Sequence, residues 1–245
     1  MLDDEYRAMF ELEERLWWYS GMRAISAAIL DGVTNLGEAS ILDVGCGTGY
    51  AMKWLQELVG GSRVFGVDSS ARGAELWKQR SIDRASLAGA DQLPFGDAIF
   101  DLLTCFDVVY QFDTAKTGAA LREFNRVLRR GRALLIREPA YDWLRGSHDR
   151  AVGTRHRFTR RELVGLLSSS GFKIRRATYA NTLLLPLALP HRIFSRRGGS
   201  DRSDVRRVSP LLNSAFGSAL RLEARMLRRV SFPFGLSVVV VAEKV

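Results

Sequence analysis

The sequence predicts an α/β protein with a doubly wound, mostly parallel, seven-stranded sheet. Three observations predict it: a globular composition, short apolar runs that alternate with helical patterns, and a glycine-rich turn between the first run and a helix. The 245 residues are 47% hydrophobic and 26% charged, which excludes a disordered chain and suffices for one large core. We therefore expect a single domain over residues 1–245, with N-terminal helices and a lid insertion.

The first 37 residues are expected to form a helical cap on that domain. Apolar residues between Leu12 and Ile29 recur at the three- and four-residue spacing of an amphipathic helix, which predicts a helix over residues 3–31. The aromatic block Trp17-Trp18-Tyr19 and the Ser-Gly pair that follows it predict a break between two helical pieces.

Residues 38–138 have the alternating pattern of a parallel sheet and are expected to bind a cofactor. Short apolar runs that end in turn residues predict strands at 41–44, 63–67, 86–88, 101–106 and 133–136. Helical patterns lie between them at 49–59, 70–80 and 114–129. Strands and helices that alternate in this way form βαβ units, so we expect helices on both faces of the sheet.

The remaining residues are expected to complete the sheet and to add two insertions, at 139–158 and 180–209. Thr159, with Glu162 three residues later, predicts a capped helix that ends near Gly171, and a sixth strand follows at 172–179. Residues 210–245 predict a final helix to about residue 230 and a buried strand at 236–242.

The net charge of +9 comes from 36 Lys and Arg residues against 27 Asp and Glu residues. Of the basic residues 31 are arginine, and they are spread from Arg7 to Arg229, whereas a nucleic-acid footprint gathers on one face. We therefore expect no nucleic-acid partner. The charge is typical of a solvated surface; attraction of an acidic substrate, or peripheral contact with a membrane or anionic lipid, is the alternative.

The cellular compartment is predicted from three features: the N-terminal segment, the length of the apolar runs and the number of cysteines. The N-terminus is acidic where a signal peptide is basic, and no apolar run approaches the ~20 residues of a membrane span. The two cysteines, Cys46 and Cys105, are too few for a disulfide framework. These features predict a cytoplasmic protein.

The segment Ile41-Leu-Asp-Val-Gly-Cys-Gly-Thr-Gly-Tyr50 carries the chemistry. A hydrophobic strand runs into three glycines at alternate positions, and a helix follows at once, so a ligand can lie against bare backbone and helix N-terminal amides. Asp68 ends the next predicted strand, 19 residues after Gly49, where a carboxylate binds the ribose hydroxyls of a nucleotide.

The spacing of the glycines separates two kinds of nucleotide. The dinucleotide fingerprint is Gly-x-Gly-x-x-Gly, whereas Gly45, Gly47 and Gly49 give Gly-x-Gly-x-Gly. Asp43 precedes them by two residues; its charge would repel a pyrophosphate and favour an ammonium or sulfonium group. The pattern therefore favours S-adenosylmethionine over a nicotinamide cofactor.

At this point the sequence resembles the class I S-adenosylmethionine-dependent methyltransferase family, over roughly residues 38–180. Residues 42–49 match its first motif, Asp68 its ribose-binding acid, and 89–95 its third motif, in which Asp91 would hold the adenine amino group and Gln92 would lie against the ring. Residues 100–106 and 123–136 are similar to its fourth strand and its helix–Gly–strand unit. The resemblance implies a Rossmann-like methyltransferase fold, S-adenosyl-L-methionine as cofactor, and these cofactor-binding residues: Asp43, Gly45, Cys46, Gly47, Gly49, Asp68, Ser69, Asp91, Gln92 and Phe106.

The resemblance also implies a reaction and an acceptor class. The bacterial small-molecule methyltransferases are the most similar group, and their N-terminal segment often carries a Trp-Trp-Tyr like residues 17–19. Methyl transfer from a sulfonium is an in-line displacement that needs alignment and a dry pocket. Aromatic side chains stabilise the cation, and Trp17, Trp18, Tyr19, Phe106 and Tyr110 are candidates for that role or for packing.

Few side chains qualify for the remaining roles at the site. His148 and His156, in the predicted lid, are the candidate catalytic bases for a hydroxyl acceptor, with a surface role as the alternative. Arg23 is a candidate to bind the cofactor's carboxylate; the alternative is that it is an ordinary arginine exposed to solvent. No His, Cys and carboxylate cluster has metal-ligand spacing, so no metal is expected.

The acceptor is expected to be a small amphiphilic molecule, either isoprenoid or lipid-linked, or else an aromatic metabolite. The apolar stretch Leu183–Leu189 beside basic residues suggests such an acceptor, or else it covers the edge of the core. An RNA, DNA or protein methyltransferase and a cofactor-binding regulator without catalysis are the alternatives. The amino-methylating DNA enzymes of this fold have a proline-containing tetrad that is absent from Cys105-Phe-Asp-Val-Val-Tyr110.

Overall fold

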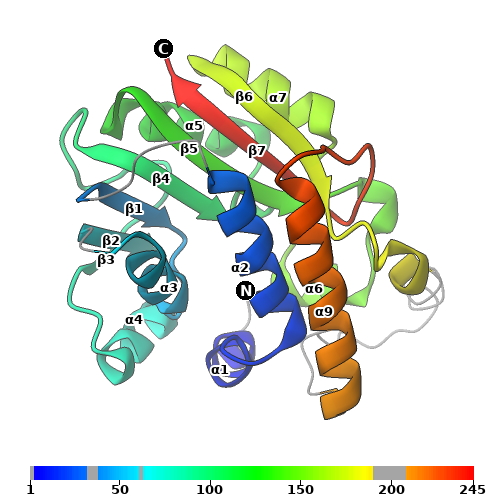
Figure 1. Cartoon of the computed structure of the whole chain (residues 1–245). Coiled ribbons are helices and arrows are strands. Elements are labelled where there is room, and N and C mark those ends of the chain that lie inside the picture. Colours follow the sequence, from blue (N-terminus) through cyan, green and yellow to red (C-terminus); the bar gives the residue numbers. More distant parts are fainter. Residues whose placement is uncertain (1–2, 32–37, 61–62, 190–207) are drawn as a thin grey trace.

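The computed structural model describes residues 3–31, 38–60, 63–189 and 208–245. It contains a seven-stranded sheet in the order β3-β2-β1-β4-β5-β7-β6 (Figure 1). The pairs between β3, β2, β1, β4 and β5 are parallel, and β7 lies antiparallel between β5 and β6. The predicted fold class, a mostly parallel sheet wound on both faces, is confirmed.

The strands occupy the positions at which the apolar runs predicted them, within a few residues. They are β1 Ser40–Val44, β2 Arg63–Asp68, β3 Ala85–Leu87, β4 Phe100–Phe106, β5 Leu128–Pro139, β6 Phe172–Ala180 and β7 Ser237–Lys244. Every residue of β1 is buried, as expected for a central strand covered on both faces. Helices cover each face, and two apolar clusters form the core between the helices and the sheet.

The helices are divided between the two faces of the sheet. They are α1 Asp3–Leu12, α2 Trp17–Leu30, α3 Tyr50–Val59, α4 Ala71–Trp77, α5 Thr114–Val127, α6 Ser147–Val152, α7 Arg160–Ser169 and α9 Pro210–Leu227, with 3₁₀ turns η1 Lys78–Arg80, η2 Val109–Gln111 and η3 Asp142–Leu144. Helices α5 and α7 pack on one face, and α2, α3 and α9 pack on the other. Among the described residues, no helix has the length and apolar character of a membrane span.

Close packing of α2 against α9 fixes the start of α2 near the carboxyl edge of the sheet. A Cβ on Gly21 would lie 2.3 Å from Cδ1 of Leu220, so only glycine lets the two helices approach this closely. Asn213 adds polar contacts at the same end: its side chain accepts the backbone N–H of Trp17 and donates to the carbonyl of Arg15. The Trp17–Tyr19 block is thereby held beside the ends of the strands.

Two boundary predictions were wrong. The break in the N-terminal helix lies at residues 13–16, and the aromatic block that was expected to cause it forms the first turn of α2. The helix predicted over 114–129 ends at Val127, because Leu128 already pairs with Phe100 as the first residue of β5. The capping box of Thr159 and Glu162 and the Ser209 cap of α9 are confirmed.

Candidate active site

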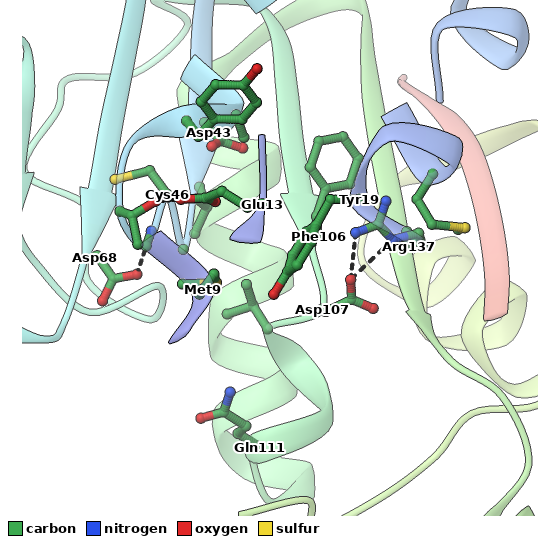
Figure 2. A pocket seen from close by; sticks show the side chains of 18 of the residues that line it. Met9, Glu13, Tyr19, Asp43, Cys46, Asp68, Phe106, Asp107, Gln111 and Arg137 are labelled. Carbon is green, nitrogen blue, oxygen red and sulfur yellow. Dashed lines mark hydrogen bonds and ion pairs between the residues drawn. The ribbon is translucent and has the colours of Figure 1, made fainter. Parts of the chain in front are cut away.

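A cavity of about 240 Å³ opens at the carboxyl edge of the sheet, where ligands bind in open α/β sheets. Its walls come from the ends of β1, β2, β4 and β5, from α2, and from α1, which contributes Met9 (Figure 2). Eleven of the lining residues were named as candidates from the sequence: Trp18, Tyr19, Arg23, Asp43, Gly45, Cys46, Gly47, Asp68, Ser69, Phe106 and Tyr110. The cavity therefore brings together most of the predicted cofactor site.

The glycine turn has the backbone conformation that its sequence predicts. Gly45, Gly47 and Gly49 all have positive φ angles, of 76°, 55° and 86°. Gly45 and Cys46 donate their backbone N–H groups to the carbonyl of Val67, which ties the turn to β2. Gly49 is the N-cap of α3 and is not among the residues that line the cavity.

Asp68 joins the turn to the second strand. Its Oδ2 accepts the backbone N–H of Gly47 at 2.9 Å, and its Oδ1 accepts the N–H of Ser70 at 2.8 Å. The hydroxyl of Tyr6, from α1, donates to the same Oδ1 at 3.2 Å. The carboxylate therefore faces the cavity beside bare backbone, in the arrangement predicted for a ribose-binding acid.

Asp43 is a buried carboxyl group in the wall of the cavity. The hydroxyl of Thr104, its register partner on β4, donates to Oδ1 at 2.7 Å. Burial raises the pKa of Asp43 to about 7, although the Thr104 hydrogen bond opposes the shift. A cation in the cavity would favour the ionised form, so the site suits a positively charged ligand.

No pattern in the sequence predicted that α1 would cover the glycine turn. Met9 lies against Gly47, and Glu13 accepts a hydrogen bond from the hydroxyl of Thr48. Arg80 holds Glu13 from the other side, with Nη2 3.0 Å from Oε1. Burial raises the pKa of Glu13 to about 7. Strand and helix patterns carry no information about such a contact, because it joins residues far apart in the chain.

A buried glutamate organises the loop that follows β4. The carboxyl group of Glu138 accepts three backbone N–H groups, those of Val108, Val109 and Tyr110, at 3.1–3.2 Å. Its neighbour Arg137 lines the cavity and forms an ion pair with Asp107. The sequence analysis did not predict a role at the site for Glu138, Arg137 or Asp107.

Other predicted residues lie outside the cavity. Asp91 and Gln92 are not among its lining residues, although Ala90 beside them is, and Asp91 lies 3.4 Å from the ammonium of Lys116. The stretch predicted to form an acceptor wall, Leu183–Leu189, is not in the lining either: Leu184 packs in the core, while Leu187 is exposed. The basic residues beyond it, 190–207, lie outside the described residues.

Of the two candidate bases, the one whose side chain the structure describes is not brought to the cavity. His156 has Nδ1 2.8 Å from Asp142 and Nε2 2.7 Å from Glu162, and it is not a lining residue. Both ring nitrogens therefore have carboxylate partners, one on η3 and the other on α7. His148 belongs to α6, but its side chain lies outside the described part of the structure.

Comparison with known proteins finds a methyltransferase domain in this chain. A family model described as a methyltransferase domain matches residues 42–136. The demethylmenaquinone methyltransferase of Thermotoga maritima is 30% identical over 112 residues, which are 45% of this chain and 48% of that protein. The malonyl-[acyl-carrier protein] O-methyltransferase of Serratia marcescens is 34% identical over 106 residues, 43% of this chain and 40% of that protein. The alignments with these and other relatives span less than half of the relatives' own lengths.

The fold is also found among solved structures. Geranyl diphosphate C-methyltransferase from Streptomyces coelicolor A3(2), solved with S-adenosyl-L-homocysteine, superposes with a TM-score of 0.60 at 17% identity. The superposition covers 90% of this chain and 78% of that one. The glycine turn, Asp68 and the match of residues 42–136 to the methyltransferase model together support a class I, S-adenosylmethionine-dependent methyltransferase domain in this chain.

Proposed function

We propose that this chain transfers the methyl group of S-adenosylmethionine to a small amphiphilic acceptor. The observation that carries the proposal is the turn at 45–49, whose Gly47 amide is bonded to Asp68 at the mouth of the cavity. A further feature fits a ligand: Ser26 Oγ lines the cavity and is buried, and among the described residues it has no hydrogen-bond partner.

The residues of the cavity have separate roles in this proposal. When bound, the cofactor supplies a methyl group on a cationic sulfur. Asp68 would accept the ribose hydroxyls, and Asp43 would neutralise positive charge near the turn. Phe106, Trp18 and Tyr19 exclude water and provide π faces for a cation. These residues would align the acceptor with that methyl group and keep water out of the space between them.

The acceptor class is supported by the aromatic wall and by relatives. Trp18, Tyr19, Phe106, Tyr110 and Phe112 all line the cavity, which suits an aromatic or isoprenoid surface. Two of the relatives reported above are named for demethylmenaquinone and for malonyl-[acyl-carrier protein], and a structural neighbour is named for geranyl diphosphate. These names favour a small-molecule acceptor over RNA, DNA or protein.

The proposal is tested by cofactor binding and methyl transfer. We expect the purified protein to bind S-adenosylhomocysteine in calorimetry and to move a labelled methyl group from S-adenosylmethionine into a small molecule of a cell extract. Gly45→Ala should weaken the binding at least tenfold, because its φ of 76° strains alanine and the new Cβ would lie 2.2 Å from Val108 Cγ2.

The matched control for that variant is Gly131→Ala. Gly131 also has a positive φ, of 71°, but a Cβ there meets nothing within 4 Å and the residue is outside the cavity. It should bind S-adenosylhomocysteine like the wild type. Equal affinity of the wild type and Gly45→Ala, or binding of a nicotinamide cofactor instead, would contradict the proposal.

Cofactor affinity is expected to depend on pH through Asp43. Its pKa is raised to about 7 by burial and by the charge of Asp68, while Arg137 and the Thr104 hydrogen bond act in the opposite direction. A sulfonium favours the ionised carboxylate, so affinity for S-adenosylmethionine should rise as pH increases from 6 to 8.

S-adenosylhomocysteine provides the internal control, because its sulfur is neutral. Its affinity should change less over the same range, and the ratio of the two dissociation constants, measured by calorimetry, should shift in favour of S-adenosylmethionine. Asp43→Asn should remove most of this pH dependence and leave only the part due to Glu13, which also lines the cavity and has a pKa of about 7. A wild-type ratio that stays constant from pH 6 to 8 would remove Asp43 from this role.

A further inference from the structure

The part of the cavity away from Asp68 contains a buried arginine. Arg137 is near the end of β5, and its side chain is only 9% exposed. Its register partner on β4 is Phe106, and β4 lies between β5 and the strand that carries the glycine turn. Since adjacent strands are about 4.8 Å apart, Arg137 is about two strand spacings from that turn. Figure 2 shows Arg137 and Asp107 on one side of the cavity and Asp68 on the other, with Phe106 between them.

Aromatic rings hold the guanidinium of Arg137 in place. Its Cζ atom lies 4.8 Å from the centroid of the Phe106 ring and 5.4 Å from that of Trp18. Burial of an arginine costs free energy, and contact with two π faces offsets part of that cost. A planar cation that is already oriented in a water-poor cavity loses little entropy when it binds a planar or tetrahedral anion.

The protein partner of Arg137 uses only part of its hydrogen-bonding capacity. Nε and Nη2 both donate to one oxygen of Asp107, Oδ2, at 3.0 and 2.5 Å. In the part of the chain that the structure describes, Nη1 has no hydrogen-bond partner, and neither does the Oδ1 atom of Asp107. An arginine–carboxylate pair of full strength uses both oxygens in parallel. Asp107 is also a quarter exposed, so water can solvate its carboxylate if another anion takes its place.

A second arginine in the lining, Arg23, is the candidate for the cofactor's carboxylate. Arg23, in α2, lies over the ring of Tyr50, the first residue of α3, at 4.6 Å. Its terminal nitrogens donate to the carbonyls of Glu13 and Glu14, at 2.7 and 3.3 Å. This arginine is therefore beside the glycine turn and its helix, whereas Arg137 is beside the ends of β4 and β5.

We propose that Arg137 binds an anionic group, a carboxylate or a phosphate, of the methyl acceptor, with Asp107 as the counter-ion that the acceptor displaces. The inference rests on the proposed function, because it assigns the part of the same cavity around Arg137 to the methyl acceptor. Binding of an anion there places a negative charge within the site of a cationic cofactor, which favours the assembled complex.

The test uses three probes of similar shape: benzoate, phenyl phosphate and benzamide. Each is titrated into protein saturated with S-adenosylhomocysteine, and its dissociation constant is measured by ligand-observed NMR. At least one anion should bind ten or more times as tightly as benzamide, and whether benzoate or phenyl phosphate binds more tightly identifies the acceptor's group. In Arg137→Gln this preference should fall below twofold. Arg175→Gln, which removes a surface arginine paired with Glu243, should keep it.

Two further measurements separate the inference from other roles of Arg137. In Asp107→Asn, which lacks the competing charge, the preferred anion should bind at least threefold more tightly. In Arg137→Gln the affinity for S-adenosylhomocysteine should stay within threefold of the wild type, whereas in Arg23→Gln it should fall at least fivefold. Thermal melts check that each variant is folded.

The outcomes distinguish the inference from the proposed function. Benzamide binding as tightly as both anions, an anion preference that survives in Arg137→Gln, or a loss of cofactor affinity in that variant would each overturn the role of Arg137. Loaded wild-type protein that binds neither anion would do the same and leave the methyltransferase proposal standing. Wild-type protein that fails to bind S-adenosylhomocysteine would contradict the proposed function itself.

Discussion

Replacing Asp68 with alanine is expected to weaken the binding of S-adenosylhomocysteine by at least a hundredfold. A hydrogen bond to a charged acceptor contributes about 1.5–3 kcal/mol, and a ribose offers two hydroxyls to this carboxylate. The loss of both corresponds to a factor of roughly 10²–10⁴. The variant also removes the acceptor of the Gly47 amide, so the turn itself loses a contact that holds it open to the ligand.

Tyr6→Phe makes a sharp comparison for Asp68→Ala. The Tyr6 hydroxyl donates to the same Oδ1 that a ribose would use, so the two donors compete for one oxygen. Removal of the hydroxyl leaves the carboxylate intact, and S-adenosylhomocysteine should bind at least as tightly as to the wild type. Asp97→Ala, at a mostly exposed carboxylate outside the cavity, should change nothing. Calorimetric affinity of Asp68→Ala within threefold of the wild type would exclude the ribose role.

The features that the sequence predicted correctly are those with local causes. The positive φ angles of the glycine turn follow from residue type, and the burial of β1 follows from its apolar residues Ile41, Leu42 and Val44. Asp68 was predicted because a carboxylate at the end of the second parallel strand must face the end of the first. Each of these inferences needs only the order of strands and the identity of neighbouring residues.

The features that were missed depend on contacts between distant elements. Arg137 is one of 31 arginines, and only the register with Phe106 and the approach of Trp18 from α2 distinguish it. Glu13 acquires its partner Thr48 from the packing of α1 across the turn, for which the sequence carries no periodic signal. The break at residues 13–16 contains neither glycine nor proline, and the aromatic block drew the prediction to the wrong place.

Glu138→Ala is expected to lower the free energy of unfolding by about 3–5 kcal/mol. The Glu138 carboxyl group is completely buried, and it is the acceptor for three consecutive backbone N–H groups after β4. Removal leaves these donors without a partner, and each unsatisfied donor costs about 1–3 kcal/mol where water cannot replace the acceptor. Urea denaturation measures the change. Glu75→Ala, at an exposed glutamate paired with Arg72, should alter stability by less than about 0.5 kcal/mol.

The pH dependence of the free energy of unfolding separates the effect of the charge of Glu138 from the effect of its hydrogen bonds. Burial and the charge of Asp107 raise the pKa of Glu138 to about 8, above its value in the unfolded chain. A raised pKa gives a stability contribution that is complete at low pH and is lost as pH rises through about 8. Glu138→Gln keeps an acceptor oxygen without titrating, so the stability difference between the wild type and this variant should shrink between pH 6 and 9. A difference that grows with pH would mean that the three amides hold an ionised carboxylate, and that the loop carrying Asp107 depends on its charge.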